Sequence, residues 1–218
     1  MIETESLLDK PRLRGALHAL AFPVVLVAGL ILVATGPTLP SRLAAVVYVL
    51  ASVSLFGVSG WYHRANIAPR TAELLRRFDH ANIYLIIAGT YTPFAVVALD
   101  GAPRLTLLLV IWIGAAAGVV FRVLWIGAPR WLYTSLYIAL GWTAVFFLPW
   151  LLPGAGVGPS ILVLTGGLLY SFGGLVYGLK RPDPSPKWFG FHEVFHSFTV
   201  AAYVAQFVAV ALVVYGAG

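Results

Sequence analysis

The chain has 218 residues, of which 60% are hydrophobic and only 10% are charged. Because a soluble domain is about one quarter charged, this composition excludes a soluble globular protein and predicts an integral membrane protein. The absence of cysteine excludes disulfides, thiolate metal ligands and cysteine nucleophiles. The formal net charge of +6 predicts no nucleic-acid partner, because the basic residues lie in short connections between apolar segments.

Seven segments are apolar enough to cross a bilayer, for which about 20 residues are needed. We expect these spans at residues 16–34, 43–63, 80–99, 105–123, 131–152, 160–179 and 191–215. The first span and its N-terminal flank are too long for a cleaved signal peptide, so we expect that span to be retained. The sequence therefore predicts one all-α, seven-transmembrane helix bundle over residues 1–218, with a short cytoplasmic N-terminal segment at 1–15.

The basic residues are distributed unevenly between the two sides of the predicted bundle. Twelve of the 14 Lys and Arg residues precede the first span or lie in the second, fourth and sixth connections, and only Arg42 and Arg104 lie in the others. Lys and Arg in short loops mark the cytoplasmic side of a membrane protein. We therefore predict a cytoplasmic N-terminus and an external C-terminus, in a multi-pass protein of the plasma membrane.

Ionisable residues from distant parts of the sequence are predicted to reach one depth of the membrane. His63 ends the second span, Asp79 opens the third, and His192 and His196 open the seventh. With the predicted orientation, all four lie in the cytoplasmic leaflet. Ionisable groups at membrane depth are costly, and they commonly mark functional sites.

The residue types and their spacing favour a metal site. His192 and His196 are four residues apart, so they share one face of a helix. A catalytic zinc ion takes three protein ligands and a water, and His63 is the candidate third ligand. Asp79 could hold the water or accept its proton, and Ser59 lies one turn before His63 on the same face.

Two further histidines are expected to lie outside this site. For His18, we expect the role of an amphipathic anchor at the membrane interface. His80 directly follows Asp79, so it is rotated by about 100° on the helix and is expected to point elsewhere. The sequences "GAAAG" (114–118) and "GLVYG" (174–178) carry small residues four apart, which is typical of close helix packing.

The stretch "HEVFH" (192–196) also matches the zinc-protease motif H-E-x-x-H, in which Glu193 would be the general base. No histidine follows His196 to supply a third ligand downstream, which weighs against a soluble-type metalloprotease. An intramembrane metalloprotease could instead use an aspartate from a distant span. The role of Glu193 therefore stays open at this point.

Three stretches together resemble a known family. "SGWYH" (59–63), "RRFDHANIYLIIAGTYTPF" (76–94) and "FGFHEVFHSF" (189–198) are similar to the marker segments of bacterial hemolysin III proteins, within the progestin and adipoQ receptor family. They resemble alkaline ceramidases more remotely. The resemblance implies that His63, His192 and His196 bind Zn²⁺, that Asp79 contacts the metal-bound water, and that Ser59 belongs to the same polar cluster.

The sequence departs from this family pattern ahead of the first span. Members often carry a Glu and an Asn before a His, whereas this chain reads "PRLRGALH", with Pro11 and Arg14 at those places and only His18 kept.

We consider three functions. The first is a zinc-dependent hydrolase of membrane lipids, which cleaves an amide or ester in the cytoplasmic leaflet, with ceramide-like amides suggested only by the remote resemblance. The alternative is a non-enzymatic, zinc-stabilised sensor or receptor-like regulator of membrane lipid state. A channel, carrier or cytolysin is the least favoured.

Overall fold

The computed structural model describes residues 11–125 and 127–217. The regular elements of these residues are eight helices: α1 (Ala16–Thr35), α2 (Leu39–Arg64), α3 (Pro69–Ala98), α4 (Gly101–Leu124), α5 (Arg130–Gly141), α6 (Thr143–Ala155), α7 (Val157–Leu179) and α8 (Phe191–Tyr215). Seven stretches are long and apolar enough to cross a membrane, with α5 and α6 together forming one of them. The predicted all-α fold with seven spans is therefore confirmed.

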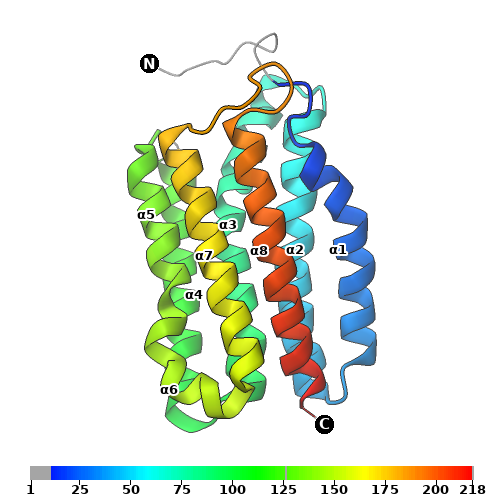
Figure 1. Cartoon of the computed structure of the whole chain (residues 1–218), viewed down its shortest axis with the longest axis vertical. Helices are drawn as coiled ribbons and strands as arrows, with labels where there is room; N and C mark the ends of the chain where they lie inside the picture. Colours follow the sequence, from blue (N-terminus) through cyan, green and yellow to red (C-terminus); the bar gives the residue numbers. More distant parts are fainter. Residues whose placement is uncertain (1–10, 126, 218) are drawn as a thin grey trace.

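The helices run side by side, and α1 begins at the end of the bundle opposite to that where α8 finishes (Figure 1). This arrangement agrees with an odd number of crossings. The connections α2–α3, α4–α5 and α7–α8 lie at the end where α1 begins, and most of the basic residues are in these connections or in the helix turns next to them. Residues 1–10 of the predicted N-terminal segment lie outside the described residues. That this end faces the cytoplasm stays a prediction from charge.

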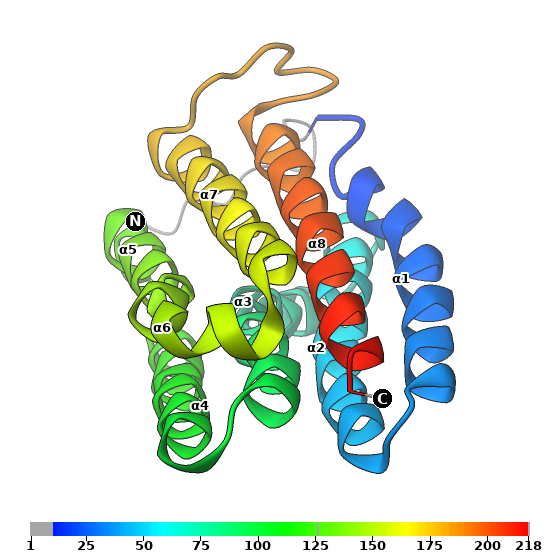
Figure 2. The same cartoon turned by 60° about the horizontal axis from the view of Figure 1, so that its bottom comes forward.

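Helix α3 forms the centre of the bundle, where it packs against α2, α4, α5, α6 and α8 (Figure 2). Helix α1 lies at the edge, against α2 and α8. Large apolar side chains such as Leu20, Leu124 and Phe146 are more than 70% exposed on the outside of the bundle. In a bilayer these side chains would contact lipid, because there is no aqueous phase to drive them inward.

Small residues let neighbouring helices approach closely, as the two glycine patterns predict. A Cβ at Gly118 would collide with the ring of Tyr84, and one at Gly114 would meet Leu140 at 2.6 Å. At Gly174 a Cβ would lie 3.2 Å from Thr134, whereas nothing lies within 4 Å of the corresponding position at Gly178. The first pattern is thus a packing motif at both glycines, and the second at only one.

The fifth span is broken, which the sequence did not predict. The expected continuous segment 131–152 is divided at Trp142 into α5 and α6. The hydroxyl of Tyr91 in α3 donates to the carbonyl of Gly141 at 2.5 Å and accepts from the backbone amide of Ala144 at 2.8 Å. A side chain that inserts into the backbone ladder in this way is a known cause of sharp helix bends.

Candidate metal centre

Three histidines from two distant helices converge at the end of the bundle where α1 begins. His63 lies in the last turn of α2, and His192 and His196 lie in the first two turns of α8. Each offers a ring nitrogen, and the three nitrogens lie within 4.8 Å of one another. The Nε2 atoms of His63 and His192 are 3.2 Å apart. We call these three residues the histidine trio.

The spacing of the histidine trio fits a metal ion. Zinc binds imidazole nitrogen at about 2.0–2.1 Å with tetrahedral geometry, which places two such ligands about 3.3 Å apart. The 3.2 Å separation of His63 and His192 also suits a hydrogen bond between the two rings. The buried Nδ1 of His196, however, has no hydrogen-bond partner among the described residues. A buried donor or acceptor without a partner is costly, so hydrogen bonds within the chain do not fully satisfy the polar atoms at this place.

The two residues predicted to take part in the chemistry lie next to the histidine trio. The Oδ2 of Asp79 is 3.8 Å from Nε2 of His63, and the Asp79 side chain is only 15% exposed. The buried Ser59 hydroxyl faces the Asp79 carboxyl group. The structure thus brings all five predicted site residues to one place, and the metal-binding and catalytic roles assigned to them stay predictions.

Glu193 is turned away from the histidine trio and holds the beginning of α8. Its Oε2 accepts a hydrogen bond from the backbone amide of Gly190 at 2.8 Å, in a capping arrangement. Its Oε1 lies 2.8 Å from Nε of Arg14, in an ion pair whose side chains are 1% and 10% exposed. Because both carboxylate oxygens are engaged in this way, the structure weighs against Glu193 as the base of a protease site.

Arg14 stands where the family pattern often has an amide, and its partner is the glutamate within the seventh-span motif. The ion pair joins the segment before α1 to the first turn of α8, between the two histidines of that helix. Further backbone hydrogen bonds link Arg12 to Lys187 and Leu13 to Trp188, at 3.0 and 3.1 Å. Where the chain departs from the family pattern, these contacts therefore connect the segment before α1 to the beginning of α8, next to the histidine trio.

Replacing Glu193 with Gln is expected to lower the free energy of unfolding by about 3 kcal/mol, because it leaves the Arg14 guanidinium buried without its counter-charge. Thermal unfolding of the purified protein in detergent measures this effect. The control is Glu73→Gln, which removes the partner of Arg77 in a solvent-exposed pair and should change little. Unchanged stability with a lost hydrolytic activity would instead assign Glu193 to catalysis.

The prediction for His18 is wrong. This residue is buried, with 2% exposure, and its ring stacks on that of His196 at a centroid distance of 3.8 Å and an interplanar angle of 8°. It also contacts the ring of Phe56 edge-on at 4.9 Å. A histidine at the start of a first span resembles an interfacial anchor in sequence. Only the packing of α1 on α2 and α8 places His18 against the ring of His196, a candidate ligand.

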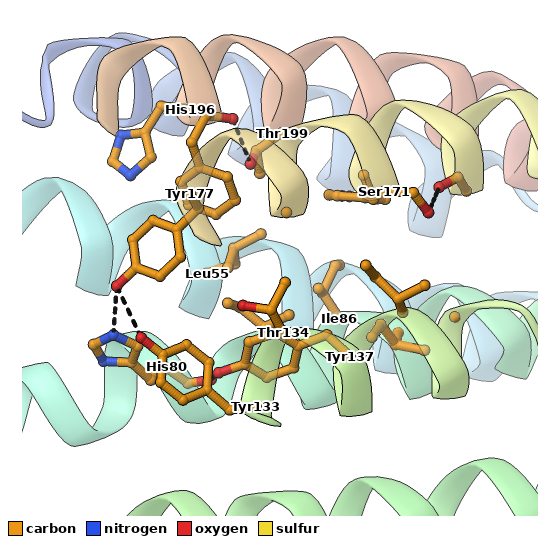
Figure 3. A pocket seen from close by; sticks show the side chains of 18 of the residues that line it. Leu55, His80, Ile86, Tyr133, Thr134, Tyr137, Ser171, Tyr177, His196 and Thr199 are labelled. Carbon is orange, nitrogen blue, oxygen red and sulfur yellow. Dashed lines mark hydrogen bonds between the residues drawn. The ribbon is translucent and has the colours of Figure 1, made fainter. Parts of the chain in front are cut away.

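His80 lies outside the histidine trio, as its rotation from Asp79 predicts. Its Nδ1 is 2.7 Å from the carbonyl oxygen of Arg76, one turn earlier in α3, and its Nε2 is 3.5 Å from the hydroxyl of Tyr177 (Figure 3). His80 nevertheless lines the same cavity as Asp79 and His192.

That cavity extends from the candidate metal centre into the bundle between α2, α3, α5, α7 and α8. Its lining on α8 runs from His192 to Gln206, and at 1.5 Å per residue this corresponds to about 21 Å along the helix. Most of the surface that the lining exposes to the cavity is apolar. Sequence reasoning missed the contributions of Tyr133, Tyr137 and Tyr177 (Figure 3), because a tyrosine in a span looks like an ordinary interfacial residue.

A seven-span helical bundle with converging histidines at the head of an internal cavity defines a polytopic membrane protein with a candidate metal centre. The model of the family described as haemolysin-III related matches residues 7–207. The chain therefore belongs to the haemolysin III family and is a multi-pass membrane protein, as the marker segments predicted.

Two relatives show the extent of the similarity. The chain is 36% identical over 139 residues to a hemolysin-3 homolog of Bacillus subtilis (strain 168), and this alignment covers 63% of this chain and 62% of the relative. It is 33% identical over 140 residues to hemolysin-3 of Bacillus cereus, and this alignment covers 64% of this chain and 61% of the relative. The alignment thus spans about six tenths of the length of these curated relatives.

Proposed function

We propose that this protein is a zinc-dependent hydrolase of membrane lipids that cleaves an amide or ester bond near the cytoplasmic face. The observation that carries the proposal is the position of the histidine trio, which stands with Asp79 at the head of a long, mainly apolar cavity. Zinc held by three protein ligands supplies a water of lowered pKa and polarises a carbonyl group.

The residues around the histidine trio have the properties that such a reaction needs. Asp79 lies next to His63, and a carboxylate there could accept a proton from a reacting water. Ser59 faces Asp79 and can orient either the carboxylate or the carbonyl oxygen of the substrate. The low exposure of these groups keeps bulk water away, which strengthens the electrostatic interactions between them.

The cavity favours a lipid over a peptide as substrate. Its lining includes Leu55, Ile83, Ile86, Ile87 and Phe195, which offer few hydrogen bonds to a peptide backbone. An acyl chain requires none, and its burial among such side chains is favourable. An acyl chain in the cavity would bring its carbonyl carbon to the end where the histidine trio lies.

One observation favours a second candidate, in which the metal is structural and the protein senses membrane lipid state. The Oδ2 of Asp79 lies 3.8 Å from a ring nitrogen of His63, so the carboxylate could serve as a fourth ligand to an ion held by the histidine trio. A site with four protein ligands is closed and stabilises the fold rather than reacting. Such an ion would clamp α2 and α3 to α8.

The names of the relatives suggest lysis of red cells, but we do not propose a pore for this chain. Helix α3 occupies the centre of the bundle (Figure 2), and the cavity beside it has a mainly apolar lining. Water-filled pores have a polar lining.

The proposal is tested with purified protein in nanodiscs of inert ether lipid, loaded with zinc and supplied with a ceramide or an ester phospholipid. We expect release of free fatty acid that stops on chelation and returns on addition of zinc, as measured by mass spectrometry. The His196→Ala variant is the matched control and should release none. Bound zinc without release from any amide or ester lipid would favour the structural role.

A further inference from the structure

A second group of polar side chains adjoins the candidate metal centre on the side of α5 and α7. We call it the arginine–tyrosine cluster; its members are His80, Arg122, Arg130, Tyr133 and Tyr177. They come from α3, α4, α5 and α7, and the proposed hydrolytic chemistry uses none of them. The ring of Tyr177 lies 5.7 Å from that of His192, so the cluster and the histidine trio share one wall.

Positive charge is concentrated in this cluster. The guanidinium of Arg130 lies 5.3 Å from the ring centroid of Tyr177, and that of the buried Arg122 lies 4.2 Å from the ring of Tyr133. Both cations lie close enough to His80 to act on it electrostatically. No ion pair between residues that the structure describes includes Arg130.

Arg130 carries a donor that is buried and makes no hydrogen bond to any described group, namely its Nη1. Burying a charged donor without an acceptor is costly. The cation–π contact with Tyr177 compensates for part of this cost. The N–H groups of a guanidinium lie in its plane, however, so contact with a ring face gives them no hydrogen-bond acceptor. The Arg130 side chain is therefore suited to receive an anionic oxygen from outside the chain.

The hydroxyl groups of the cluster are only loosely bonded to one another. That of Tyr177 is 3.4 Å from the hydroxyl of Tyr133 and 3.5 Å from Nε2 of His80 (Figure 3). Normal hydrogen bonds of these types are shorter by several tenths of an ångström. These three groups also line the cavity, so they can turn toward a guest oxygen.

We propose that the arginine–tyrosine cluster binds the phosphate group of an anionic lipid whose chains lie in the apolar cavity. A guanidinium matches the oxygens of a phosphate with paired donors, and phenol hydroxyls add neutral donors around them. The lipid source is favoured because three members of the cluster, His80, Tyr133 and Tyr177, line the mainly apolar cavity, although free phosphate offers the same chemistry. This binding does not depend on hydrolysis and stands apart from the proposed enzymatic activity.

The test measures binding of a dialkyl phosphatidic acid to the purified, zinc-loaded protein in micelles of neutral detergent by calorimetry. Its ether-linked chains cannot be hydrolysed, and the matching dialkylglycerol lacks only the phosphate. We expect the phosphatidic acid to bind at least tenfold more tightly than the dialkylglycerol. Arg130→Gln should remove this preference, since it deletes a charge-assisted hydrogen bond, and Tyr177→Phe should weaken binding several-fold while it keeps the ring.

Arg70→Gln is the matched control, because Arg70 is an exposed arginine at the same end of the bundle; it should leave binding unchanged. Inorganic phosphate is titrated in a separate arm. If the wild-type protein binds the free ion and Arg130→Gln does not, phosphate itself is a sufficient ligand. If the wild-type protein does not bind the free ion, the site is assigned to the lipid. Equal affinity for phosphatidic acid and dialkylglycerol, or full affinity in a folded Arg130→Gln protein, would overturn the proposal. If Arg130→Gln does not fold, equal affinity of the wild-type protein for phosphatidic acid and dialkylglycerol remains the result that would overturn the proposal.

Discussion

Zinc is expected to bind the purified protein at about one ion per chain and to be lost from His196→Ala. With three imidazole ligands, removal of one leaves two protein ligands, which is fewer than zinc sites in proteins normally have. His63→Ala and His192→Ala should give the same result, although these residues lie on different helices. Metal analysis after dialysis against a weak chelator measures the retained zinc, and thermal unfolding with and without zinc shows its contribution to stability.

The buried neighbour of the histidine trio provides the control for this prediction. His18→Phe keeps a ring that can stack on His196 but removes both nitrogens, so it should keep the metal. Loss of zinc from His18→Phe, with zinc retained in one of the trio variants, would assign the ligands differently. Retention of zinc in all three alanine variants would show that the histidines do not hold it.

The second large effect is expected at Asp79. Replacing it with Asn preserves the shape of the side chain but removes the carboxylate that would accept a proton from the reacting water. We expect lipid hydrolysis to fall by about a hundredfold to ten-thousandfold, with one zinc ion still bound per chain. Fatty acid release and metal content are measured on the same preparation.

Two variants sharpen this measurement. Asp100→Asn removes an exposed carboxylate that pairs with Arg104 at the opposite end of the bundle, and activity should be unchanged. Ser59→Ala should lower activity less than Asp79→Asn, because it removes only an orienting group. If Asp79→Asn loses its zinc together with its stability, Asp79 is a ligand, and the structural role described above is the better account. Full activity in Asp79→Asn would contradict the proposed chemistry.

Glu193, whose role the sequence left open, and His18, for which the prediction is wrong, show the limits of sequence reasoning in this chain. The motif H-E-x-x-H is compatible with a protease, and only the contacts of Glu193 with Gly190 and Arg14 reveal a helix cap and an ion pair. For His18, the sequence gives its depth in the membrane but not the direction in which it points. A side chain near the end of a span faces lipid or the bundle according to helix rotation, which no local pattern specifies when the helix is apolar on all sides.

The sequence by itself determined the membrane class, the seven spans and the meeting of His63, Asp79, His192 and His196 at one depth. Composition and span length suffice for these features, because a bilayer fixes the direction of each helix and therefore the level of each residue. Only the tertiary structure decided the break between α5 and α6, the burial of His18 and the joining of Arg122 and Arg130 with tyrosines beside the cavity. These features depend on how helices rotate and pack against one another, and such contacts between distant residues leave no periodic signal in the chain.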